Sequence, residues 1–212
     1  MSNSKLAVPQ LAAVKIDGMT RSSFILRSTL AAGAVYGGAA VGPFVKQAMS
    51  QENMGDIEIL NFALTLEVLE NTFYEDALQE VSGLSSDVQT LAEEIQSNEA
   101  EHVDTLTATI EDLGGEPVEA PKFDFGDAFQ DEDAFLELAQ TFEDTGVSAY
   151  NGAAPMIEAS EVLEAAGSIV QIEARHAALV RLLRGESPAP TAFDESLEQQ
   201  EVLDAVMPFI EA

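Results

Sequence analysis

The chain has no cysteine, only two histidines and few basic residues, and each scarcity excludes some classes of function. Without cysteine it can form no disulfide, thiolate metal site or iron–sulfur cluster, and it has no cysteine nucleophile. Any redox cycle must therefore draw electrons from a separate donor or from the substrate. Nine Lys and Arg stand against 38 Asp and Glu, a formal net charge of −29, which argues against nucleic acid as a partner. No glycine-rich nucleotide-binding loop is evident.

The charge is unevenly distributed along the chain. Residues 1–50 contain five basic residues and one acidic residue, whereas residues 51–212 contain four basic and 37 acidic residues. A surface this acidic, with so little lysine, fits a protein that works at high salt, where screening removes self-repulsion. A merely acidic secreted protein is the alternative.

Residues 1–50 are expected to form a targeting segment rather than part of the folded core. The stretch from Thr20 to Leu26 resembles a twin-arginine export signal in which Ser22 replaces the second arginine. A weakly apolar run rich in Ala and Gly follows, from Ser28 to Val45, and is marginal in length for a membrane span. We therefore expect an exported protein, with a retained membrane anchor as the alternative and a cytoplasmic location less favoured.

Both histidines lie in the same four-residue phrase, Glu-x-x-His, at Glu99–His102 and Glu173–His176. Residues three apart share one face of a helix, so each phrase can direct a carboxylate and an imidazole to one point. Because the two phrases use every histidine in the chain, they predict a metal site built between helices. The alternative is a core His and Glu that only hydrogen-bond each other.

Each phrase also occupies the inward face of a long amphipathic segment. Apolar residues hold all other inward positions, at steps of three or four. A carboxylate buried in a core is costly unless it is compensated, which two divalent cations would do. The two inward series are Val88, Leu91, Ile95, Glu99, His102, Leu106, Ile110 and Leu113 in residues 86–113, and Val162, Ala166, Ile169, Glu173, His176, Val180 and Leu183 in residues 160–184.

Two further helices are predicted over residues 56–81 and 131–154, and each carries a Glu seven residues before a Tyr. The spacing from this Glu to the next Glu-x-x-His is 32 residues in one case and 30 in the other, so the chain is an internal repeat of two helix pairs. The two Glu–Tyr pairs are Glu67 with Tyr74 and Glu143 with Tyr150.

Some residues near the predicted centre have alternative roles. Glu70 competes with Glu67 as a ligand, but its counterpart in the second repeat is Gly146, which favours Glu67. Tyr74 and Tyr150 point toward the centre and either hydrogen-bond the ligand carboxylates or serve as ordinary core residues. No acidic residue precedes Glu173 to orient the opposite imidazole, since Ile172 occupies that position.

The connections favour an all-α four-helix bundle with one long crossover. A short turn at residues 83–85 joins the first two helices as antiparallel neighbours, and residues 114–130 are long enough to cross the bundle. Pro155 is expected to end or kink the third helix, Ser160 to cap the fourth, and Gly185 to end it. The bundle is assigned to residues 51–185 and a short docking tail to residues 186–212.

Four helices contributing Glu, Glu-x-x-His, Glu and Glu-x-x-His resemble the ferritin-like di-iron and di-manganese carboxylate proteins. Residues 59–67 and 165–176, together with the tail around Phe193 and Pro208, look like the desiccation-related members. The resemblance implies a ferritin-like bundle with a dinuclear metal centre. In that centre Glu99 and Glu173 would bridge the two ions. Glu67 and Glu143 would each bind one ion terminally, and His102 and His176 would each bind one ion.

Oxygen and nitrogen ligands suit two ions of iron or manganese, and zinc also fits. The expected function is redox chemistry with oxygen or hydrogen peroxide in stress protection, as a ferrous oxidase or a catalase-like enzyme. The alternative is a non-enzymatic metal-binding or structural stress protein of the desiccation type. An iron-storage cage is disfavoured because no cage-closing fifth helix is evident. A homo-oligomer, most simply a dimer, is expected.

Overall fold

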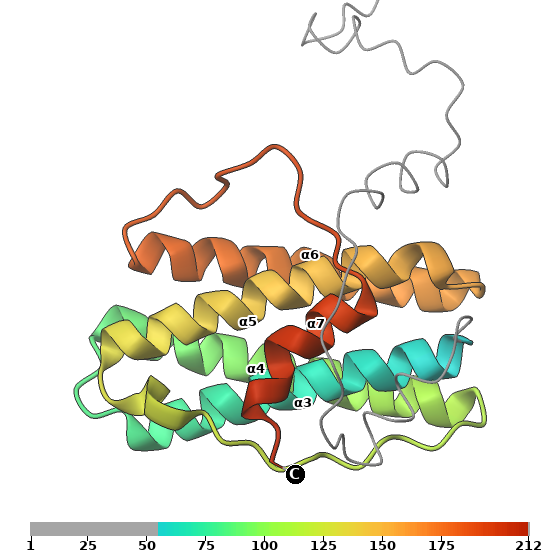
Figure 1. The fold of residues 1–212 in the computed structure, drawn as a ribbon, viewed down its shortest axis with the longest axis horizontal. Coiled ribbons are helices and arrows are strands. Elements are labelled where there is room, and N and C mark those ends of the chain that lie inside the picture. Colours follow the sequence, from blue (N-terminus) through green and yellow to red (C-terminus); the bar gives the residue numbers. More distant parts are fainter. Residues whose placement is uncertain (1–54, 212) are drawn as a thin grey trace, which may run out of the picture. The chain divides into compact units, whose positions relative to one another are not determined.

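The computed structural model describes residues 55–211. Within this range four long helices form a bundle, and a shorter helix packs against it (Figure 1). The prediction of an all-α four-helix bundle with one long crossover is confirmed. The predicted leader, residues 1–50, lies outside the described residues. The helices are α3 (Asp56–Glu80), α4 (Ser86–Asp112), α5 (Glu132–Ala153), α6 (Ser160–Leu183) and α7 (Gln199–Val206).

The bundle consists of two hairpins, α3 with α4 and α5 with α6. The first hairpin turns at Gly83, whose φ of +85° lies in the left-handed region that favours glycine. In the second, Pro155 lies in the 3₁₀ turn η3 (Ala154–Met156), which ends α5 as expected. The hairpins pack together through α3 with α5 and α4 with α6, which brings the repeated segments face to face. None of the described helices is long and apolar enough to cross a membrane.

The start of α6 differs from the prediction. Ser160 is the first helical residue rather than the cap, and the N-cap position falls on Ala159, which provides no side-chain hydrogen bond. The free backbone N–H groups of Glu158 and Ala159 instead donate to the two carboxylate oxygens of Asp56, each over 2.8 Å. Asp56 therefore fixes the backbone just before α6, and the N-cap residue itself contributes no side-chain cap to the first turn. The other end is as predicted, since Gly185 follows α6 with a φ of +75°.

The crossover and the tail meet on one side of the bundle. The crossover contains a 3₁₀ turn, η2 (Gly126–Phe129), and its Phe123 pairs with Ile210 of the tail in an isolated antiparallel bridge. The tail helix α7 packs on α5 with Val202, Leu203 and Val206 buried. The expected docking of the C-terminal segment on the bundle is thus observed (Figure 1).

The inward faces of the helices are largely as predicted, with one clear exception at the end of α4. Leu113, which the periodicity predicts to face inward, is 41% exposed. It lies one residue beyond α4, at the C-cap, and Gly114 then turns the chain with a φ of +80°. The helical periodicity therefore no longer applies at Leu113. Two apolar clusters fill the two ends of the bundle and leave a polar centre between them.

Candidate metal centre

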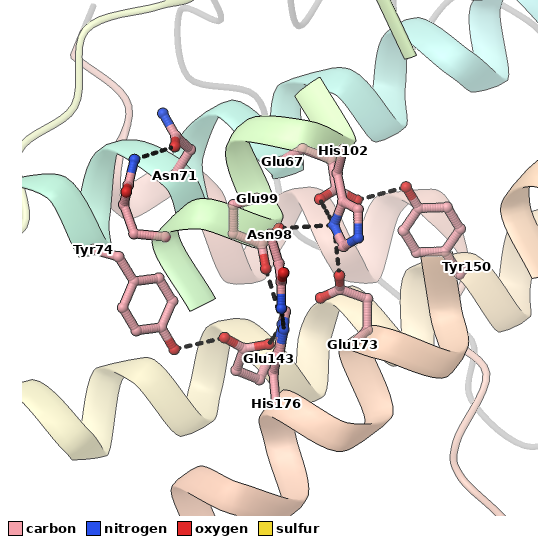
Figure 2. A network of polar contacts seen from close by, with 11 residues as sticks. Glu67, Asn71, Tyr74, Asn98, Glu99, His102, Glu143, Tyr150, Glu173 and His176 are labelled. Carbon is pink, nitrogen blue, oxygen red and sulfur yellow. Dashed lines mark hydrogen bonds and ion pairs between the residues drawn. The ribbon is translucent and has the colours of Figure 1, made fainter. Parts of the chain in front are cut away.

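The six residues predicted as metal ligands converge at the middle of the bundle, one or two from each long helix (Figure 2). All six are buried, and three of the carboxylates are fully inaccessible to solvent. The structure thus gathers the whole predicted set, while a metal-binding role for these side chains remains a prediction. The residues are Glu67 on α3, Glu99 and His102 on α4, Glu143 on α5, and Glu173 and His176 on α6.

One half of the centre is built around His102. Its Nδ1 atom lies 3.1 Å from a carboxylate oxygen of each of Glu67, Glu99 and Glu173. An imidazole nitrogen carries at most one hydrogen, so hydrogen bonding cannot satisfy three carboxylates at this one atom. A cation bound by all four groups would satisfy them, and their ligand atoms are close enough together to hold one.

The other half is built around His176. Its Nδ1 atom lies 2.9 Å from Glu99 Oε1 and 3.4 Å from Glu143 Oε2. None of these three buried atoms has a hydrogen-bond partner of acceptable geometry. The two carboxylate oxygens of Glu173 also lack such a partner. Buried polar atoms are normally paired, so such a concentration of unpaired atoms calls for a bound cation. Glu99, Glu143, Glu173 and His176 form a second set that could hold a metal ion.

Glu99 and Glu173 belong to both ligand sets. Glu67 and His102 belong only to the first set, whereas Glu143 and His176 belong only to the second. This division agrees with the roles that the resemblance implies, namely two bridging carboxylates and one terminal carboxylate and one imidazole for each ion.

Burial perturbs the carboxyl groups of the centre. It raises the pKa of Glu67 well above the ordinary value, with repulsion from Glu173 adding to the effect. Burial, followed by repulsion from Glu99, also raises the pKa of Glu173 to about 8. Burial also raises the pKa of Glu143. Protons are therefore held on carboxylates that the ordinary pKa would leave ionised at neutral pH.

For the two imidazoles and Glu99, contacts with groups of opposite charge outweigh burial and favour the charged form. Burial alone would lower the pKa of His102, but contacts with Glu173 and other carboxylates raise it to about 12. His176, likewise buried but next to Glu143, has a pKa raised to about 10. Burial alone would raise the pKa of Glu99, but hydrogen bonds from the two imidazoles hold it at about 2. Without metal, protons on the imidazoles balance part of the negative charge, and divalent cations could replace them.

The two tyrosines of the repeat hydrogen-bond the terminal carboxylates of the opposite hairpin. The hydroxyl of Tyr74 donates to Glu143 Oε1, and that of Tyr150 donates to Glu67 Oε1, each over 2.5 Å. Burial and the neighbouring carboxylate raise both tyrosine pKa values well above the ordinary value, so both hydroxyls keep their protons. Of the two roles left open by the sequence, the structure thus shows hydrogen bonding, from side chains that are also buried in the core.

Glu70 is a fifth buried carboxylate at the centre, although sequence reasoning treated it only as a rival of Glu67. It belongs to neither ligand set, whereas Glu67 contacts His102 directly. A Cβ atom added to Gly146 would lie 3.1 Å from Glu70 Oε1 and 3.3 Å from Glu173 Oε2. The bare backbone of Gly146 therefore leaves the room that the Glu70 side chain uses. A Glu in one repeat aligned with a Gly in the other was the signal in the sequence.

Asn98 is a second residue that sequence reasoning missed. Its side-chain amide nitrogen lies 3.0 Å from Nε2 of His176, the ring nitrogen on the far side from the ligand cluster. With Nδ1 of His176 bound to a metal, Nε2 would carry the ring proton and donate it, so the Asn98 amide would turn its oxygen to the ring and hold the ring in place. The equivalent position before the second Glu-x-x-His phrase is Ile172, which has no polar group. The first repeat carries the orienting residue.

A family model described as a ferritin-like domain matches residues 55–186. This range is more than half of the chain and contains all four helices of the bundle, with every residue of the centre described above. Among curated proteins, none matches the chain.

Proposed function

The chain belongs to the ferritin-like family, and on that premise we propose that it binds two metal ions at the centre of its bundle and uses them in redox chemistry with oxygen or hydrogen peroxide. The observation that carries this proposal is the pair of overlapping ligand sets, each with three carboxylates and one imidazole. Oxygen-rich sites with imidazole suit iron and manganese. Bound there, either metal supplies reversible one-electron chemistry.

The proposed division of ligands follows the two sets. Glu67 and His102 would hold one ion, and Glu143 and His176 would hold the other. Glu99 and Glu173 would contact both ions. These four carboxylates neutralise two divalent ions when both imidazoles are neutral.

Glu70 is a fifth buried carboxyl group beside the centre. Burial, followed by repulsion from Glu173, raises its pKa well above the ordinary value, so it holds a proton. The four ligand carboxylates then balance two divalent ions, and loss of the Glu70 proton could balance one positive charge gained on oxidation, whereas zinc has no redox change to balance.

The surrounding residues would orient the ligands and exclude water. Tyr74 and Tyr150 each donate a hydrogen bond to one terminal carboxylate and so leave its other oxygen free for a metal. Asn98 contacts the outer nitrogen of His176 and leaves the inner nitrogen free as a ligand. The apolar clusters at both ends limit solvent at the centre. Electrons must come from a separate donor or from the substrate because the chain has no cysteine cluster.

The direct test is metal analysis of protein purified without added metal, followed by reaction of the reduced, loaded protein with oxygen or hydrogen peroxide. We expect two ions per chain, an absorbance change on mixing and repeated consumption of the oxidant when a reductant is supplied. Protein that binds two ions but stays spectroscopically unchanged with both iron and manganese would overturn the redox proposal. Fewer than two ions per chain would overturn the dinuclear assignment.

A further inference from the structure

An apolar pocket lies at the end of the bundle beside Tyr150. The space between its walls is about 420 Å³ when the part open to solvent is counted, and helices α3, α4, α5 and α6 all contribute to the walls. The part that can hold the centre of a water-sized molecule is about 20 Å³, so the pocket has room for one small molecule. Among its lining residues are Leu60, Leu106, Ala149 and Val162.

The internal repeat shows why the pocket exists. The counterparts of its lining residues lie at the other end of the bundle, beside Tyr74, and there the equivalent space is filled. Phe73, fully buried, stacks on Phe135 at 5.3 Å and meets Phe142 edge-on at 5.0 Å. In the alignment that equates Glu67 with Glu143, these three phenylalanines correspond to smaller residues that line the pocket, namely Ala149, Ile59 and Leu66.

The substitution of Ala149 for Phe73 makes the largest difference. Two walls are alike at both ends, since Val162 and Ala166 of the pocket correspond to Val88 and Ala92 at the filled end. At one wall the pocket end has the larger residue, Phe62, where the filled end has Leu138. The same backbone arrangement thus accommodates a phenylalanine cluster at one end and leaves it out at the other. The fold itself does not require the space.

The pocket reaches almost to the candidate metal centre. The ring of Tyr150 lines it, and the hydroxyl of that ring donates to Glu67 Oε1 over 2.5 Å. A single side chain therefore separates the pocket from a terminal ligand of the His102 half. At its outer edge Ala153 and Ile157 are only half-buried, which gives a path from solvent.

We propose that this pocket binds a small apolar molecule and holds it beside the His102 half of the centre. The walls are almost wholly apolar, and the one hydroxyl on them is already engaged by Glu67, so a polar ligand would lose its hydrogen bonds to water without replacement. Apolar cavities of comparable chemistry take up xenon or benzene. The inference rests on the proposed function in placing a metal behind Tyr150.

Binding can be tested on the metal-free full-length chain, so that its outcome is independent of the metal proposal. Xenon-pressurised crystals should show a xenon atom between Leu60 and Ala149, and benzene should raise the melting temperature. Ala149→Phe, which installs the residue of the other repeat, should abolish both effects. Ala166→Leu fills the same space from α6 and should also weaken them. Thr141→Phe adds a ring at an exposed position of α5 and should leave them intact.

The outcomes separate the two proposals. Absence of xenon and benzene binding from the wild-type chain would overturn the pocket as a ligand site, whatever metals the protein binds. Equal binding to the wild-type chain, Ala149→Phe and Ala166→Leu would place the ligand elsewhere and overturn it as well. Loss of binding in these two variants, with retention in Thr141→Phe, would support it even in a chain that takes up no metal.

Discussion

Replacing Glu99 by Gln is the sharpest test of the centre. Glu99 is fully buried, belongs to both ligand sets and lies within 3.1 Å of Nδ1 of both histidines. Gln keeps nearly the same volume, so packing around the side chain should be preserved, but an amide oxygen is neutral and a much weaker ligand. One substitution should therefore weaken both metal positions together.

The magnitude follows from mass action. A ligand that binds only the folded state stabilises it by about 2.7 kcal/mol when its free concentration is 100 times its Kd. Two ions at that concentration stabilise the wild-type fold by about 5 kcal/mol. For a domain of this size, each kcal/mol raises the Tm by about 2–4 °C, which gives a metal-dependent rise of about 10–20 °C. Glu99→Gln should lose most of it.

The assay is a thermal melt with and without metal, paired with metal analysis of the dialysed protein. Glu101→Gln is the matched control because Glu101 is an exposed carboxylate two residues along the same helix. It should behave as the wild-type chain does. If Glu99→Gln still binds two equivalents and keeps its metal-dependent rise in Tm, then Glu99 does not join the two ligand sets and the assignment is wrong.

Four further predictions concern the surroundings of the centre and the whole chain. Tyr150→Phe removes the hydrogen bond to a terminal ligand and should weaken one metal about tenfold by titration; Tyr74→Phe should do the same to the other. Glu70→Ala should leave two ions bound, and a lower count in metal analysis would make Glu70 a required ligand. The free energy of unfolding of the metal-free protein, measured in urea, should fall as pH rises from 4.5 toward 8. Buried carboxyl groups such as Glu173, with a pKa of about 8 in the folded protein, must release protons in this range. Above pH 6.5 the raised pKa of His102 should lower the free energy of unfolding further. Bound metal should offset this loss increasingly with pH. The Tm should rise between about 0.1 and 1 M salt, as the Debye length falls from about 10 to 3 Å; a Tm independent of salt would exclude adaptation to high salt.

The fold was largely predictable because the helices carry strong, repeated periodicity. The inward series through Glu99 and through Glu173 combine apolar steps with two charged positions that only a common polar centre can explain. The predictions that were wrong concern the helix ends, because hydrophobic periodicity does not determine where a helix begins or stops. The carboxylate that holds the backbone just before α6 is Asp56, which is 103 residues from Ala159 in sequence. Such a long-range contact cannot be inferred from local cap preferences.

The candidate site was predictable in its composition but not in its asymmetry. Sequence spacing brought out the six equivalent residues because they obey the repeat. Glu70, Asn98 and the open space at Ala149 depart from the repeat, and spacing alone assigns them no role. Their meaning depends on what each residue faces across the bundle, as Glu70 faces Gly146, and only the three-dimensional arrangement supplies that information.

These departures make the two halves of the centre unequal even though their ligands match. On the His176 side, Asn98 holds the imidazole and phenylalanines fill the space beyond the adjacent tyrosine. On the His102 side, Ala149 leaves a pocket beyond Tyr150. His102 is also the more exposed histidine, at 9% against 3%. A molecule entering through the proposed pocket would therefore reach the His102 half first, while the opposite half is the more rigidly held. Exchanging Phe73 for Ala and Ala149 for Phe in one chain should reverse that order of access.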